Sequence, residues 1–127
     1  MSYFGSITQN VKADANNSST DNLVSSNEYT YTGTYTSTLG VVGLQWSLKT
    51  DRQARVYIEQ SPDFTNWDVS DSFIVEPTVG SGGTVQAVNS YWRIRVVLID
   101  QNDTTYFRLQ AVLCPIGDYK CQQMKMQ

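Results

Sequence analysis

The sequence predicts an all-β fold, an antiparallel β-sandwich of about seven to eight strands with jelly-roll or immunoglobulin-like topology. Apolar and polar residues alternate in several segments, as in half-buried strands. Gly, Pro, Asn and Asp separate these segments at regular spacing. No window has a helical period, apart from the short tail after Gly117. At 127 residues the chain is long enough for one two-layer core.

Three regions differ in composition. Residues 1–27 are predicted to form an extended N-terminal arm, residues 28–116 the sandwich, and residues 117–127 a C-terminal tail. Within the arm, residues 16–22 are expected to be too hydrophilic to bury. The arm is either a disordered terminus or a segment that becomes ordered on a neighbouring subunit. The second reading rests on four apolar anchors, Tyr3, Phe4, Ile7 and Val11.

The strands follow in order from Glu28. The first places Tyr29, Tyr31 and Tyr35 on one face, and Gly33 indicates a bulge within it. The later strands are predicted at 42–49, 54–60, 72–76, 84–88, 91–99 and 105–113. Their inward-facing residues are predicted to include Leu44, Trp46, Leu48, Val56, Ile58, Trp92, Ile94, Val96, Phe107 and Leu109. Hairpin pairing is expected between 91–99 and 105–113, and between 42–49 and 54–60.

The stretch Ser-Pro-Asp-Phe-Thr-Asn-Trp-Asp, residues 61–68, predicts a tight corner between two strands. Proline fixes its own backbone angle, and Asp63 can accept hydrogen bonds from amides two residues further on. Trp67 is expected to fold back onto the core, because a polar loop does not normally carry so large a ring. The predicted corner consists of Ser61, Asp63, Asn66, Trp67 and Asp68.

The composition argues against catalysis. The chain has no histidine, the commonest general base, and no Gly-x-Ser-x-Gly or phosphate-binding glycine loop. We therefore expect no enzymatic activity, no cofactor and no metal. A calcium site is a weak alternative, since four oxygen-bearing side chains lie near the corner, namely Asp63, Asn66, Asp68 and Asp71.

Charge and cysteine content restrict the partners. A net charge of −3 argues against nucleic acid, which needs a basic surface. No apolar run is long enough to span a membrane, and no secretory signal is visible at the N-terminus. Synthesis in a cytosol then predicts that Cys114 and Cys121 are free thiols.

A predicted basic stripe is the clearest functional feature. It contains arginines that share the outward parity of strands 91–99 and 105–113, flanked by tyrosines: Arg93, Arg95, Arg108, Tyr91 and Tyr106. Arg55 joins it if its strand is adjacent. In one reading the stripe is a solvated face that pairs with Glu59 or Glu76. In the other it contacts an acidic protein surface or an acidic sugar, because arginine binds carboxylates with two parallel hydrogen bonds.

Three stretches, 57–68, 84–96 and 105–116, resemble a β-sandwich module of tailed-bacteriophage virion proteins. The resemblance covers roughly residues 33–116, and its most specific part is the corner Ser-Pro-Asp-x-Thr-Asn-Trp-Asp. The chain departs from that module at Phe64, where glycine is common.

The resemblance implies a non-enzymatic virion structural protein, assembled in the host cytoplasm. A single sandwich with an arm is similar to capsid cement or decoration proteins, which bind the major capsid protein or another virion protein, often as homotrimers. The alternative is a carbohydrate- or receptor-binding module of a head or tail fibre, in which Trp67, Tyr91 and Tyr106 stack on sugar rings. An accessory domain of an enzyme is a third possibility.

Overall fold

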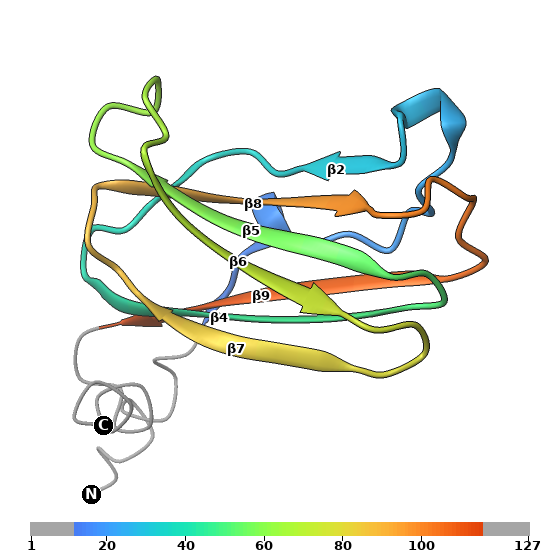
Figure 1. The fold of residues 1–127 in the computed structure, drawn as a ribbon. Helices are drawn as coiled ribbons and strands as arrows, with labels where there is room; N and C mark the ends of the chain where they lie inside the picture. The colour runs from blue at the N-terminus through green and yellow to red at the C-terminus, as the bar shows by residue number, and fades with distance from the viewer. Residues whose placement is uncertain (1–11, 116–127) are drawn as a thin grey trace, which may run out of the picture.

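The computed structural model describes residues 12–115, which form two antiparallel sheets packed face to face (Figure 1). The predicted all-β sandwich is confirmed. The four-stranded sheet has the order β1-β9-β4-β7. Its strands are β1 (Lys12–Ala13), β4 (Val41–Thr50), β7 (Ser81–Gln86) and β9 (Phe107–Pro115).

The five-stranded sheet has the order β2-β8-β5-β6, and β3 also pairs with β8. Its strands are β2 (Thr30–Thr32), β3 (Thr36–Ser37), β5 (Ala54–Ser61), β6 (Val69–Val75) and β8 (Tyr91–Leu98). Two single 3₁₀ turns, η1 (Ala15–Asn17) and η2 (Ser25–Asn27), precede β2. Within residues 12–115, no helix is long and apolar enough to cross a membrane.

The strand pairing is that of a jelly roll. β1 pairs with β9, β4 with β7, and β5 with β6, while β2 and β3 pair with successive parts of β8. If β2 and β3 are taken as one interrupted strand, the first strand pairs with the last, the second with the next to last, and so on inward. The sequence predicts either a jelly-roll or an immunoglobulin-like topology, and this nested pairing is that of the jelly roll.

Both predicted hairpins are wrong. β8 pairs with β5 and β9 pairs with β4, so the two strands of each expected hairpin lie in opposite sheets. A hairpin and a corner that crosses between sheets need the same signals, namely two alternating strands and a short polar connection. The turn at residues 51–53 therefore leads from β4 to the facing sheet.

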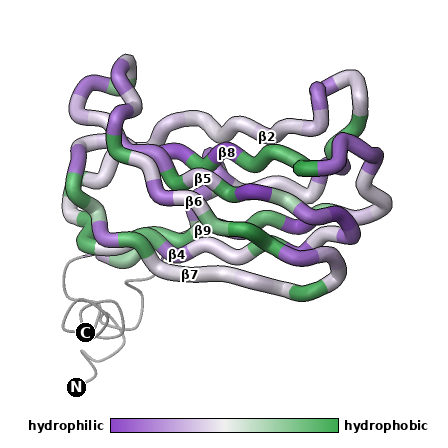
Figure 2. The backbone as a smooth tube through the Cα atoms, in the orientation of Figure 1, coloured by the Kyte–Doolittle hydropathy of each residue, from purple (hydrophilic) through white to green (hydrophobic). Residues whose placement is uncertain are grey.

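The core lies between the sheets and matches the predicted inward residues closely. Figure 2 shows hydrophobic stretches along the strands of both sheets and hydrophilic residues in the loop between β5 and β6. The largest fully buried side chain is that of Trp92, which is 0 % exposed. The hydrophobic core also includes Leu44, Trp46, Leu48, Val56, Ile58, Ile94, Val96, Leu98, Phe107 and Leu109.

The described part of the expected arm, residues 12–27, packs on the sandwich. β1 and Ser19 extend the edge of the four-stranded sheet along β9, and Leu23 is 2 % exposed within the core. The expectation that residues 16–22 stay unburied is wrong for Asn17, which is 0 % exposed.

Polar partners allow this burial. The Asn17 side chain accepts a hydrogen bond from the backbone N–H of Ile94 and donates one to the Asp14 carboxylate, at 2.7 and 2.9 Å. The predicted irregularity at Gly33 lies here, between β2 and β3. A Cβ on Gly33 would lie 1.9 Å from the Asn17 amide oxygen, so only glycine fits.

The prediction of a free thiol is wrong for Cys114, because this residue is disulfide-bonded. It lies in β9 and is fully buried. Cys121 lies outside the described residues, as does the predicted C-terminal tail.

Candidate functional site

The outer face of the five-stranded sheet carries the densest group of chemically distinctive side chains in the described chain. They come from β5, from β8, from the β5–β6 corner and from the segment before β3. We call this group the arginine–aromatic face: Tyr35, Tyr57, Glu59, Phe64, Trp67, Tyr91, Arg93 and Arg95.

Glu59 organises the middle of this face. The antiparallel register places it opposite Arg93 and places Tyr57 opposite Arg95. Its carboxylate accepts a hydrogen bond from Nε of Arg93 at 2.8 Å, and Arg95 donates to it from Nη2 at 3.1 Å. Glu59 is only 6 % exposed, and both arginines lie against its carboxylate. The first interpretation of the arginines, pairing with Glu59, is therefore present in the structure for Arg93 and Arg95.

Each arginine also lies over an aromatic ring. The guanidinium carbon of Arg95 is 4.1 Å from the centre of the Tyr57 ring, and that of Arg93 is 4.4 Å from the Trp67 ring. Trp67 is partly exposed and lies outside the buried core cluster, so the expectation that it folds back onto the core is wrong. Its ring instead holds Arg93 against Glu59 by a cation–π contact.

Three more rings cluster beside the corner. Tyr35 and Phe64 stack nearly parallel, with ring centres 4.8 Å apart and an angle of 12°. Tyr91 meets Phe64 edge-on at 5.1 Å and Tyr35 edge-on at 5.6 Å. Tyr35 and Phe64 remain 45 and 49 % exposed. Sequence reasoning did not assign Tyr35 or Phe64 to a site.

The predicted basic stripe is divided between two sheets. Arg108 belongs to β9 in the four-stranded sheet, opposite Lys49 of β4, whereas Arg93 and Arg95 belong to β8 in the other sheet. Tyr106 precedes β9, is 39 % exposed and lines a hollow with Arg108. The stripe required β8 and β9 to pair, and they do not. The anchors predicted in the arm, Tyr3, Phe4, Ile7 and Val11, lie outside the described residues.

The corner itself has the predicted hydrogen bonding. The Asp63 carboxylate accepts from the backbone N–H of Asn66 at 2.8 Å and of Thr65 at 3.0 Å. It also accepts from the Asn66 amide and the Ser61 hydroxyl, at 2.8 and 2.9 Å. These bonds, those from the backbone of Asn66 and Thr65 first, hold the pKa of Asp63 well below its ordinary value of 3.8. Asp68 is exposed beside this corner.

This lowered pKa predicts a pH-dependent stability difference. The ionised Asp63 stabilises the folded state fully above pH 3.8, and this contribution is lost as the pH falls from there through the lower folded pKa. We expect Asp63→Asn to lower the melting temperature at pH 7 and to have a progressively smaller effect below about pH 4. Asp68→Asn removes an exposed carboxylate from the same loop and is the control. A difference between wild type and Asp63→Asn that does not change from pH 7 to pH 2 would contradict the assignment.

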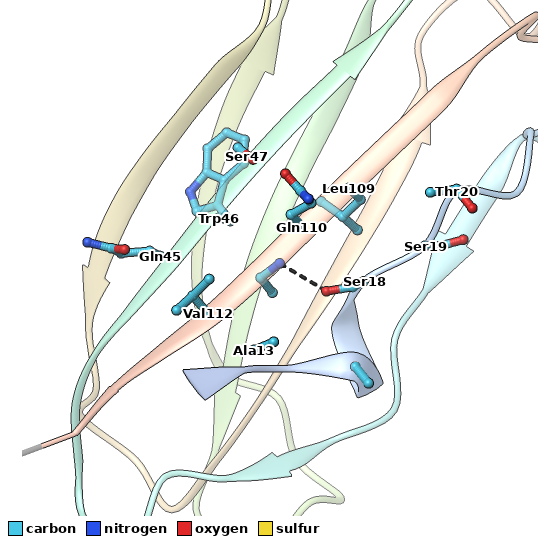
Figure 3. A pocket seen from close by; sticks show the side chains of 12 residues that line it. Ala13, Ser18, Ser19, Thr20, Gln45, Trp46, Ser47, Leu109, Gln110 and Val112 are labelled. Atoms are coloured by element: carbon cyan, nitrogen blue, oxygen red, sulfur yellow. Dashed lines mark hydrogen bonds between the residues drawn. The ribbon is translucent and has the colours of Figure 1, made fainter. Parts of the chain in front are cut away.

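A second hollow lies on the four-stranded sheet, between β9, β4 and the N-terminal segment (Figure 3). Its volume is about 680 Å³. The Ser18 hydroxyl closes one side by accepting a hydrogen bond from the backbone N–H of Ala111 at 3.0 Å. All lining residues are uncharged, including Ala13, Gln45, Ser47, Gln110 and Val112. The hollow therefore offers no ionisable group for acid–base chemistry.

Within residues 12–115, no three acidic, cysteine or histidine side chains converge as metal ligands. At the corner proposed for calcium, the Asp63 oxygens already accept bonds from Ser61, Thr65 and Asn66.

The fold and this face define the protein as a jelly-roll β-sandwich module with an arginine–aromatic surface. Residues 5–113 match the family model described as the N-terminal domain of the uncharacterised protein YqxG, so the chain belongs to that family. No curated protein matches the chain.

Among solved structures, the crystal structure of the PBSX exported protein XepA is similar. It has a TM-score of 0.71 and 17 % sequence identity, over 86 % of this chain and 38 % of that chain. At this identity the likeness shows a common fold. The present chain spans well under half of the length of that protein.

Proposed function

We propose that this chain is a non-enzymatic structural protein of a phage particle, attached to the particle surface as a cement or decoration protein. The observation that carries the proposal is the fold shared with a phage-related exported protein over 86 % of the chain. The resemblance of residues 57–68, 84–96 and 105–116 to virion sandwich modules supports it independently. The virion is then the site of action, and the proposed partner is the major capsid protein or another virion protein.

The distribution of side chains supports a structural role. The large aliphatic residues and Trp92 are used to hold the two sheets together, and the charged residues of the arginine–aromatic face pair with one another. A partner can therefore contact this chain through its outer surface. A protein of this kind stabilises a shell by binding its assembled state, as a ligand does by mass action.

The test is to locate the protein in purified particles. We expect the protein to co-sediment with DNA-filled heads, and the free protein to have the mass of a homotrimer in light scattering. Particles lacking the chain should lose DNA at a lower temperature than complete particles. A protein that stays in the supernatant, is monomeric and leaves particle stability unchanged would contradict the proposal.

The second candidate function is recognition of a carbohydrate or receptor as part of a head or tail fibre. It is favoured by a specific observation, the half-exposed rings of Tyr35 and Phe64 on the arginine–aromatic face. Adsorption of particles to host cells separates the candidates. Blocking by the free protein would support recognition, whereas normal adsorption by particles that lack the chain would contradict it.

A further inference from the structure

The backbone of Phe64 has an unusual conformation for its residue type. Its φ angle is +46°, in the left-handed region that glycine adopts without cost and that bulky residues rarely enter. A residue with a Cβ in this conformation is typically disfavoured by roughly 1 kcal/mol or more. The hydrogen bonds of Asp63 with the next residues of the corner fix this turn. Glycine would serve the turn better, so the benzyl group is present at a conformational cost.

Burial of the Phe64 ring offsets only part of that conformational cost. It stacks on Tyr35 and meets Tyr91 edge-on, yet it remains 49 % exposed. Aromatic pairs of this geometry contribute roughly 0.5–1.5 kcal/mol. The contacts fix the orientation of the rings and leave a preorganised aromatic platform at the surface. The faces of such rings are suited to stacking against the apolar face of a sugar.

Arg93 supplies a fixed cation beside this platform. It lies two residues after Tyr91 on the same face of β8, about 7 Å further along the strand. Its Nε donates to Glu59, and its guanidinium lies over Trp67. The Arg93 side chain makes no other hydrogen bond to residues 12–115, so its terminal N–H groups have no protein partner there. The Arg93 side chain is 28 % exposed.

Arg95 differs from Arg93 in this respect. It donates to the Glu59 carboxylate from both Nε and Nη2, at 3.3 and 3.1 Å. Two arginines share one carboxylate, so the group of three side chains carries a net positive charge. Arg93 uses fewer of its N–H donors than Arg95 does, and it is the arginine nearer to the platform.

We propose that Tyr35, Phe64, Tyr91 and Arg93 form a binding site for a carbohydrate that carries a carboxylate, such as a uronic acid. The sugar ring stacks on the Phe64–Tyr35 platform, and its carboxylate accepts hydrogen bonds from the terminal N–H groups of Arg93. This deepens the recognition function proposed above and rests on it. The observations favour a small acidic ligand over a protein partner, which needs about 800 Å² of complementary surface on each side. Within residues 12–115, Arg93 is the cation that follows Tyr91 of the platform on the same face of β8.

The test is a calorimetric or NMR titration of the full chain with oligogalacturonate. Phe64→Gly removes the platform ring and relieves the strained turn, so the fold should be retained. Arg93→Gln removes the free donors and leaves Arg95 paired with Glu59. We expect each substitution to weaken binding about tenfold or more, and added salt to weaken wild-type binding. Lys49→Gln removes an exposed cation from β4 of the other sheet and should leave binding unchanged.

Three results would overturn the inference. One is absence of oligogalacturonate binding by the folded wild-type chain. Another is equal binding of uncharged galactose oligomers that Arg93→Gln does not affect, which removes the role of the carboxylate. The third is equally tight binding of an acidic peptide, which would favour a protein partner. Attachment to the particle is measured separately with the same variants, so failure of sugar binding with normal co-sedimentation removes this site and leaves the structural role standing.

Discussion

Replacing Trp92 by alanine should lower the free energy of unfolding by about 3–5 kcal/mol, whereas the same change at Trp67 should cost only about 1 kcal/mol. Trp92 is fully buried between the sheets. Its indole N–H donates to the Asp14 carboxylate at 3.0 Å, so the substitution leaves both a cavity and a buried carboxylate oxygen without that donor. Trp67 loses a cation–π contact and some partial burial.

Urea unfolding of the two variants measures this difference. Trp92→Phe is the companion variant, because it keeps most of the ring volume while removing the N–H donor, and it should have an intermediate effect. If Trp67→Ala were as destabilising as Trp92→Ala, Trp67 would be a core residue and its assignment to the outer face would be wrong. The comparison also tests the arginine–aromatic face. Trp67→Ala should unfold in a single cooperative transition, and it removes the ring contact of Arg93.

The contrast between these tryptophans shows how far sequence reasoning reached. Trp92 lies in a strand whose alternation of apolar and polar residues fixes the inward face, and it was correctly placed in the core. Trp67 lies in a loop, where no period applies. A large ring in a polar loop can be covered by the core or by a charged side chain such as Arg93, and the sequence pattern is the same in both cases.

The candidate site was recoverable only in part. Arg93, Arg95 and Tyr91 share one face of one strand, which the period of two determines. Adding Arg108 required knowledge of which strands pair, and this depends on contacts between sheets. The platform joins Tyr35 to Phe64, which come from separate parts of the chain. The sequence carried one signal at Phe64, which stands where glycine is common. A turn that prefers glycine predicts a positive φ angle, so a bulky residue there is unusual.

The buried polar network at the N-terminal segment left even less trace in the sequence. Asp14 and Asn17 have partners near 34–36 and near 92–94, far along the chain. Composition therefore indicated a solvated arm, although Asn17 replaces a backbone partner that the break between β2 and β3 removes from β8, and Asp14 accepts from the Trp92 indole. Gly33 donates its N–H to the carbonyl of Ile94 at 2.8 Å, and Asn17 accepts the N–H of the same residue. The segment completes the edge of the five-stranded sheet.

Asn17→Ala should for this reason lower the free energy of unfolding by about 1–3 kcal/mol, the cost of leaving a buried donor without a partner. The Ile94 N–H loses its acceptor, whereas the Asp14 carboxylate keeps its bonds from Trp92 and Thr36. Asn16→Ala is the matched control. Asn16 is exposed, and its amide donates to the Thr36 hydroxyl at 3.1 Å, so its loss should cost about 0.5 kcal/mol.

Chemical denaturation of the two variants decides whether residues 12–27 belong to the folded unit. Amide hydrogen exchange gives an independent readout, because Asn17→Ala should expose the Ile94 N–H to exchange while the N–H groups of β4 change less. Equal, small effects of Asn16→Ala and Asn17→Ala would mean that the segment is detached in solution, as an arm would be. A large difference between these adjacent asparagines would instead mean that the buried carboxamide of Asn17 joins the N-terminal segment to β8 as part of the folded unit.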